Sequence, residues 1–215
     1  MTTSDPIART LLEIGAVTLR TDPPFTWASG RLAPIYCDNR LLMSYPEGRR
    51  LVTEAFAARI SEAGWEPRVV AGTATAGIPH AAWLAHLLDL PMVYVRGAAK
   101  GHGKENRVEG RLERGAPAVL VEDLVSTGGS SLDAAGALAE AGADLRGVTA
   151  IFTYGLDVAA RRFEEAELEL IALTDLGSML AEAESSGRLG SGERAILESW
   201  RRDPAAWSLE RGGAS

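Results

Sequence analysis

The chain has 215 residues, of which 46% are hydrophobic, and a formal net charge of −7. This length suits one α/β domain with a small appendage, and the apolar fraction is ample for a core. The charge argues against non-specific nucleic-acid binding, and no apolar run is long enough to span a bilayer. The N-terminal residues lack a signal-peptide pattern, and the single cysteine, Cys37, favours a reducing compartment. We therefore expect a cytoplasmic protein with neither nucleic-acid nor membrane partners.

Apolar periodicity and turn residues predict strands that alternate with helices along the chain. In order, we expect a helix that begins at residue 6 with an apolar stripe reaching residue 19, an irregular segment with short strands over 21–40, helix 46–63, strand 69–71, helix 78–88, strand 92–95, a polar loop over 97–110, strand 118–121, helix 130–141, strand 148–152, helix 158–165, strand 168–173, helices near 176–184 and 193–200, and frayed residues 211–215. This alternation implies a doubly wound parallel sheet.

The segment 118–131 is the most informative part of the sequence. An apolar run that suits a strand buried on both faces ends at Glu122 and Asp123, and hydroxyl and glycine residues follow before the next helix. Backbone N–H groups at a helix start attract anions, and glycines allow a phosphate to come close. The two acids can accept hydrogen bonds from ribose hydroxyls, so the segment suits a sugar phosphate. An ordinary buried strand with a polar turn is the alternative, and neither GxGxxG nor GxxxxGK[ST] occurs.

Two further loops are expected at the same carboxyl edge of the sheet, where ligands bind in open α/β folds. Residues 72–77 carry only small, uncharged side chains and suit a nest of backbone N–H groups, although a plain turn remains open. Residues 97–110, here called the lid, contain the only lysines among 22 basic residues, Lys100 and Lys104. The glycine content of residues 97–110 predicts a mobile lid whose cations meet an anion. A solvated charged loop is the alternative.

These motifs resemble those of a known family. Residues 118–131 resemble the binding motif for phosphoribosyl pyrophosphate (PRPP) in type I phosphoribosyltransferases. Residues 25–40 are similar to the hood of orotate phosphoribosyltransferases, and Arg96 with residues 100–103 resembles their catalytic loop. The resemblance implies an α/β fold with a doubly wound parallel sheet of the type I kind and a small N-terminal hood. It implies one domain over 1–215, with the hood at about 20–45, the core at 46–175 and C-terminal helices at 176–207.

The resemblance also implies a reaction and its partners. The phosphoribosyl group of PRPP would pass to orotate, giving orotidine 5′-phosphate and pyrophosphate in pyrimidine synthesis. Mg²⁺ would be the cofactor, held mainly through PRPP and water rather than by direct protein ligands. A homodimer would share the lid between subunits. Another PRPP-dependent base phosphoribosyltransferase and a non-catalytic PRPP-sensing regulator remain alternatives.

Site residues follow by resemblance, motif by motif. The catalytic residues would be Lys100, His102 and Asp123. The residues that would bind PRPP are Arg96, Lys100, His102, Glu122, Asp123, Leu124, Val125, Ser126, Thr127, Gly128, Gly129 and Ser130. The pyrophosphate loop would be Thr73, Ala74, Thr75, Ala76 and Gly77, and in the family this loop often contains a cis peptide bond.

The orotate contacts follow less directly, because this chain departs from part of the family pattern. Some orotate enzymes have a lysine where Ala28 stands, another where Ala76 stands, and an arginine within the stretch that is 152–155 here. The carboxylate of orotate must then be held by other groups. The resemblance favours Ser126, Arg40 and Tyr36 as the orotate-binding residues, with Arg31 and backbone N–H groups of the hood as further candidates.

Overall fold

The computed structural model describes residues 5–97 and 107–214. Its centre is a six-stranded sheet in the order β10-β9-β8-β5-β6-β7. The strands are β5 (Val69–Thr73), β6 (Met92–Val95), β7 (Val108–Glu109), β8 (Pro117–Val125), β9 (Asp144–Thr153) and β10 (Leu170–Asp175). Every pairing in this sheet is parallel except that of β7 with β6. The predicted α/β fold with a parallel sheet is confirmed.

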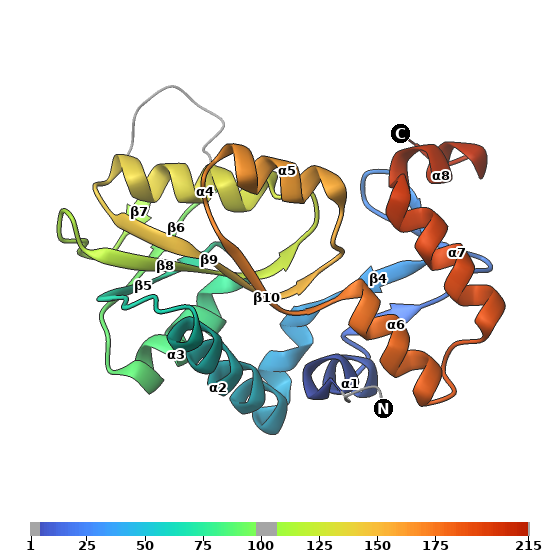
Figure 1. Cartoon of the computed structure of the whole chain (residues 1–215), viewed down its shortest axis with the longest axis horizontal. Helices are drawn as coiled ribbons and strands as arrows, with labels where there is room; N and C mark the ends of the chain where they lie inside the picture. The colour runs from blue at the N-terminus through green and yellow to red at the C-terminus, as the bar shows by residue number, and fades with distance from the viewer. Residues whose placement is uncertain (1–4, 98–106, 215) are drawn as a thin grey trace.

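Helices cover both faces of the sheet (Figure 1). The helices α4 (Gly129–Glu140) and α5 (Asp157–Glu165) lie on one face, and α2 (Pro46–Glu62) and α3 (Gly77–Leu88) lie on the other. Alternate residues of β8 therefore enter two different cores. Val119 and Val121 belong to the cluster that includes α2 and α3, whereas Ala118 and Leu120 belong to the cluster that includes α4 and α5. This double burial explains the continuous apolar run.

Short strands are present in the hood, as predicted, and they form antiparallel pairs. β1 (Val17–Leu19) pairs with β4 (Ile35–Cys37), and β2 (Phe25–Thr26) pairs with β3 (Leu32–Ala33). A 3₁₀ helix, η1 (Asn39–Ser44), then leads into α2. The hood therefore joins the sheet domain directly ahead of its first covering helix.

The C-terminal helices lie against the hood. α6 (Leu176–Ser185), α7 (Ser191–Arg202) and α8 (Pro204–Glu210) gather with the hood at one end of the molecule (Figure 1). The Oγ of Ser208 accepts a hydrogen bond from the N–H of Leu32 at 2.9 Å. The N–H of Ala214 donates to the carbonyl of Gly30, also at 2.9 Å. The expected fraying of the C-terminal residues is therefore wrong at Ala214, because the hood gives its backbone a partner.

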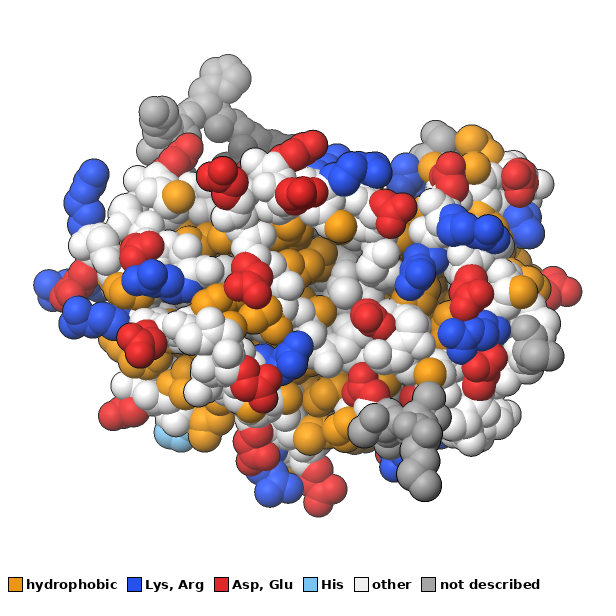
Figure 2. Space-filling view, viewed as in Figure 1, with side chains coloured by type: hydrophobic (Ala, Val, Ile, Leu, Met, Phe, Trp, Pro, Cys, Tyr) orange, Lys and Arg blue, Asp and Glu red, His pale blue; other side chains and the backbone are white. Residues whose placement is uncertain are grey.

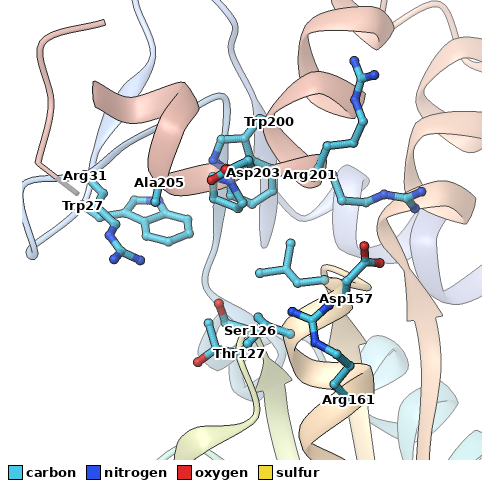
Figure 3. A pocket seen from close by; sticks show the side chains of 14 residues that line it. Trp27, Arg31, Ser126, Thr127, Asp157, Arg161, Trp200, Arg201, Asp203 and Ala205 are labelled. Carbon is cyan, nitrogen blue, oxygen red and sulfur yellow. The ribbon is translucent and has the colours of Figure 1, made fainter. Parts of the chain in front are cut away.

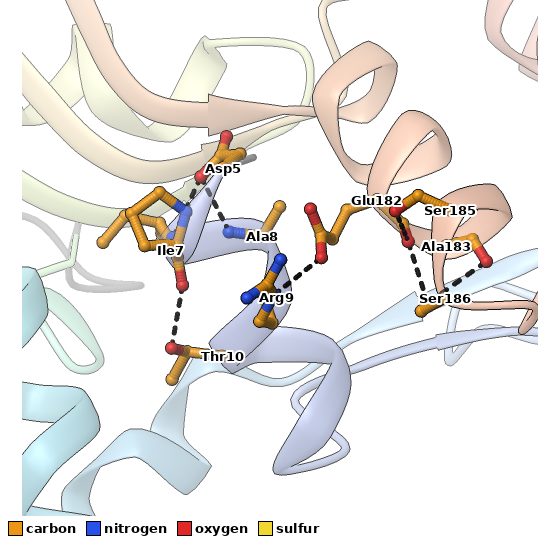
Figure 4. Close-up of polar contacts among 10 residues, drawn as sticks. Asp5, Ile7, Ala8, Arg9, Thr10, Glu182, Ala183, Ser185 and Ser186 are labelled. Carbon is orange, nitrogen blue, oxygen red and sulfur yellow. Dashed lines mark hydrogen bonds and ion pairs between the residues drawn. The ribbon is translucent and has the colours of Figure 1, made fainter. Parts of the chain in front are cut away.

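The first helix, α1 (Pro6–Glu13), is held by polar contacts at its N-terminus and at Arg9 (Figure 4). Asp5 caps it by accepting from two backbone N–H groups of the first turn, as the Asp-Pro pair predicts. The other carboxylate oxygen of Asp5 accepts from Thr174 of β10 at 2.7 Å. Arg9 donates to the buried carboxylate of Glu182 on α6 at 2.8 Å. These contacts connect α1 to the sheet and to the C-terminal helices.

Some predicted boundaries are wrong for local reasons. The apolar stripe from residue 6 does not continue as a helix to Leu19, because Gly15 with φ of 73° follows the end of α1 and Leu19 lies in β1. β8 continues past the two acids, since Leu124 and Val125 still pair with β9. The predicted lid contains β7, and α8 was not predicted although an Asp-Pro pair begins it.

The surface carries charges of both signs. On the face shown in Figure 2, basic and acidic side chains are interspersed over the sheet half and the hood half. None of the helices in the described ranges has both the length and the apolar character needed to cross a bilayer.

Candidate active site

Three loops leave the carboxyl ends of adjacent parallel strands, as predicted. β5 lies between β6 and β8, and all three run in the same direction. The loops that follow them therefore begin at one edge of the sheet. Lys100, His102 and Lys104 lie outside the described residues, so the lid is represented only by its two ends.

The loop after β5 packs its backbone against β8. The peptide bond between Ala74 and Thr75 is cis, as the family pattern predicts. A Cβ on Gly77 would clash with the carbonyl oxygen of Val121, so only glycine allows this approach. Ala76 is the N-cap of α3 and offers no side-chain hydrogen bond. In the first turn Pro79 has no N–H and the N–H of Ile78 donates to the carbonyl of Thr75 at 3.4 Å, which leaves the N–H of Gly77 for an anion. The loop from Thr73 to Gly77 thus presents backbone donors beside the acid pair.

The acid pair lies inside β8. The Glu122 side chain is 5% exposed, and its carboxylate accepts from the N–H of Asp123 at 3.1 Å and from Ser131 Oγ at 3.3 Å. Burial raises the pKa of Glu122 to about 8, with the neighbouring Asp123 charge acting in the same direction. Burial also raises the pKa of Asp123. The backbone carbonyl of Asp123 accepts from Asn39 Nδ2 of η1 at 2.7 Å, which connects the hood to the acid pair.

The loop after β8 surrounds the N-terminus of α4. Gly128 caps this helix with φ of 79°, and a Cβ there would lie 3.0 Å from the Phe163 ring. Arg162 of α5 donates to the carbonyl of Thr127 at 3.0 Å and so holds the loop from outside. Of the predicted PRPP-binding residues, Leu124 and Val125 belong to the strand, while Ser126, Thr127, Gly128, Gly129 and Ser130 form the turn and the first residues of α4. This arrangement suits a phosphate.

The two described ends of the lid are held together and to α4. Arg96 forms an ion pair with Glu109 at 3.1 Å. Arg107 donates to the backbone carbonyl of Arg96 at 3.2 Å and to Asp133 of α4 at 3.0 Å. This contact holds the pKa of Asp133 below its usual value. Arg107 belongs to the lid, residues 97–110, whose cations were expected to meet an anion, but in the structure its guanidinium is engaged by Asp133.

A cavity of about 370 Å³ opens between the loop after β8 and the hood end of the molecule (Figure 3). Ser126 and Thr127 line one side, and Trp27 and Arg31 of the hood line another. Arg161 of α5 and Trp200 of α7 also line the cavity. No ion pair to Arg31 or Arg161 occurs among the described residues, so both charges remain available to an anion. The structure thus brings Ser126 and Arg31 to one cavity.

The other two predicted orotate contacts lie outside the lining of this cavity. Arg40 is exposed and makes a bidentate pair with Asp38 at 2.6 and 2.9 Å. Tyr36 is also exposed, on β4 of the hood. The pair with Asp38 raises the pKa of Arg40 above its usual value, and the groups of Tyr36 and Asp123 add to this effect.

Sequence reasoning missed the residues that α5 and α7 contribute to the site. Arg161 and Arg162 lie on α5, and Trp200 lies on α7, far along the chain from any phosphate motif. Helical spacing alone gives such residues no functional signal. Within residues 5–97 and 107–214, no group of three or more His, Cys, Asp or Glu side chains is arranged to hold a metal ion.

Comparison with known proteins agrees with this geometry. Residues 42–168 match the phosphoribosyl transferase domain family. An orotate phosphoribosyltransferase from Listeria innocua is 51% identical over 94% of this chain and 96% of its own length. One from Halalkalibacterium halodurans is 52% identical over the same shares. The crystal structure of orotate phosphoribosyltransferase from Aeropyrum pernix gives a TM-score of 0.75 at 28% identity, covering 86% of this chain and 99% of that one. The chain therefore belongs to the phosphoribosyl transferase domain family and, within it, to the orotate phosphoribosyltransferases.

Proposed function

We propose that this protein transfers the phosphoribosyl group of PRPP to orotate, giving orotidine 5′-phosphate and pyrophosphate in pyrimidine synthesis. The observation that carries the proposal is the acid pair of β8, with Glu122 buried and Asp123 half-buried. The pair lies between the loop that ends at Gly77 and the open N-terminus of α4, and Asn39 connects the hood to it. The likeness to orotate phosphoribosyltransferases over 94% of the chain supports orotate as the base.

The chemistry follows from where charge develops. The bond between ribose C1 and pyrophosphate breaks, and its electron pair leaves with pyrophosphate. A ring nitrogen of orotate bonds to C1 and loses its proton, which passes to the leaving pyrophosphate or to water. Glu122 and Asp123 bind the ribose hydroxyls, and the Asp123 carboxylate places negative charge near the cationic ribose. Ser126 to Ser130 bind the 5′-phosphate with backbone N–H groups and hydroxyls. The loop from Thr73 to Gly77 and Arg96 bind pyrophosphate, and Lys100 and His102 stabilise its growing charge.

Mg²⁺ is proposed as the cofactor. This ion dehydrates reluctantly and commonly binds through substrate phosphates, a few carboxylates and several waters. The carboxyl groups of buried Glu122 and half-buried Asp123 at the sheet edge fit such a site, because their oxygens are ligands that Mg²⁺ prefers. We propose that PRPP and water hold the ion for the most part, and that Mg²⁺ supplies charge neutralisation at the pyrophosphate.

Orotate is proposed to lie between the hood and Ser126, with Arg40 and Tyr36 of the hood beside it. Arg31 joins this group, because its guanidinium lines the same cavity as Ser126 without an ion pair among the described residues. Arg40 would have to share its charge with Asp38. Arg31 is therefore the better placed of the two arginines to meet the carboxylate of orotate.

A homodimer is proposed, with the lid of each subunit contributing to the other site. Leu41, Met43 and Tyr45 near η1 and Leu87 of α3 are 39–50% exposed, although they are large and apolar. A second copy of the chain is proposed to cover them. A cytoplasmic location is proposed from the single free cysteine, Cys37.

Product analysis tests the proposed reaction. The purified protein is mixed with orotate, PRPP and Mg²⁺, and both the loss of orotate absorbance and the release of pyrophosphate are followed. We expect equal amounts of orotate consumed and pyrophosphate released, and no reaction when PRPP is omitted. A protein that binds PRPP without consuming orotate would instead support the sensing regulator.

A further inference from the structure

Tyr154 follows β9 directly, at the same sheet edge as the phosphate loop. Its N–H donates to the carbonyl of Val125, the last residue of β8, at 3.3 Å. Three aromatic rings enclose its own ring, those of Trp27, Phe152 and Trp200, with centroids 6.0, 5.2 and 5.2 Å away. The side chain is only 2% exposed. Packing therefore fixes the direction in which the ring, and hence the hydroxyl, points.

The hydroxyl end of Tyr154 has a different environment from the ring. No hydrogen bond connects it to a described residue, yet its oxygen is not among the fully enclosed polar atoms that lack a partner. The titratable groups around it are Cys37 and Tyr36 of the hood strand β4 and Asp123 of β8. Burial first, and then these groups, hold the pKa of Tyr154 well above its usual value. The hydroxyl therefore keeps its proton as a donor.

A hydroxyl that has lost most of its water without gaining a partner is unfavourable, and phenylalanine would fill the same aromatic cluster without that cost. We therefore expect the Tyr154 hydroxyl to gain its hydrogen-bond partner when a ligand binds. Trp27 and Trp200, which pack on the Tyr154 ring, also line the cavity opposite Ser126 (Figure 3). The tyrosine therefore lies where the hood, β8 and the cavity meet.

We infer that the Tyr154 hydroxyl donates a hydrogen bond to the pyrimidine base and so helps to select it. The inference rests on the proposed transfer to orotate. Orotate offers two ring carbonyls and a carboxylate, all of which are acceptors. Because Asp123 lies nearby, an uncharged donor binds the base without neutralising the acid that serves the ribose.

The test is Tyr154→Phe, which keeps the ring and its three aromatic contacts. We expect the KM for orotate to rise about tenfold, the effect of one lost hydrogen bond, while the KM for PRPP stays unchanged. In equilibrium binding, orotidine 5′-phosphate should bind more weakly to the variant, and ribose 5-phosphate should bind as before. The melting temperature should not fall. Tyr94→Phe on β6, outside the residues assigned to the site, is the matched control.

Three results would overturn the inference. The first is an orotate KM and orotidine 5′-phosphate affinity equal to those of the parent. The second is an equal loss of affinity for orotidine 5′-phosphate and ribose 5-phosphate, which would indicate a general distortion. The third is a fall in melting temperature without any change in orotate KM, which would make the hydroxyl structural. A parent protein that consumes no orotate would instead contradict the proposed function, and the assignment of Tyr154 with it.

Discussion

Glu122 and Asp123 lie within β8 rather than after it, so both carboxyls are surrounded by the packed end of the sheet. Their type and adjacency are visible in the sequence, but their burial is not, because it depends on β9, α3 and the hood. A buried acid pair binds ribose hydroxyls more strongly than exposed acids would, since water competes less. It also makes the unliganded protein less stable than an uncharged pair would.

This balance predicts that Asp123→Asn and Glu122→Gln impair PRPP use more than folding. The charged hydrogen bond lost in Asp123→Asn should cost about 1.5–3 kcal/mol, or roughly 10- to 150-fold in kcat/KM for PRPP, and the uncharged one lost in Glu122→Gln about 0.5–1.5 kcal/mol. Steady-state kinetics and thermal unfolding measure the two effects. Asp144→Asn, an exposed acid at the opposite end of β9, is the control. Variants that melted early but kept full activity would make the acids structural.

The raised pKa of Glu122 predicts a pH dependence of stability. The folded carboxyl binds its proton up to about pH 8, whereas in the unfolded chain it does so only up to about the model-compound value of 4.5. Between these values the folded state holds more protons, so the free energy of unfolding falls as pH rises. Glu122→Gln should flatten the decline in melting temperature from pH 5 to pH 8. An unchanged slope in the variant would show that other groups cause the decline.

At the scale of elements, glycines decide how closely the loops approach the strands. Gly128 and Gly136 form a matched pair in one segment, since the first caps α4 at φ of 79° and the second lies within α4 with open space around its Cβ position. Gly128→Ala should destabilise the protein by more than about 1 kcal/mol and raise the KM for PRPP. Gly136→Ala should stabilise it by about 0.5–1 kcal/mol without changing KM. Denaturant unfolding that gave both variants the same sign would contradict this account of the loop.

The same scale shows what could be predicted from the sequence. Strands β5, β6, β8 and β9 have strong apolar runs, and their helices have periodic stripes, so the parallel sheet was predictable. The phosphate turn was predictable as well, because its residues are contiguous. The cavity was not, since Trp27, Ser126, Arg161 and Trp200 come from four separate segments that only tertiary packing brings together. Arg107 could not be placed either, because its partner Asp133 lies on another element.

At the scale of the whole molecule, the hood is held from three sides. Asn39 connects it to β8, Ser208 and the residues after α8 bind its turn, and Trp27 packs on Trp200 of α7. The C-terminal helices therefore serve to position the hood over the acid pair. Their distance along the chain from every recognisable motif explains why the sequence suggested only helices there.

The proposed shared lid predicts complementation between two inactive variants. Lys100→Ala and Asp123→Ala chains should each lose activity, but a mixed dimer should contain one site with both residues intact. Activity should return after subunit exchange and approach one intact site per heterodimer. Two different affinity tags verify that exchange has occurred. Absence of recovery in verified heterodimers would contradict the sharing of the lid.

The central claim is that this acid pair, its phosphate loop and this hood together make a transferase for orotate. The most direct measurement is a comparison of initial rates with PRPP and Mg²⁺ and with orotate, uracil, adenine, guanine or hypoxanthine as the base. The account predicts that orotate is consumed far faster than any other base, with orotidine 5′-phosphate as the product. Faster turnover of uracil or of any purine than of orotate would contradict it.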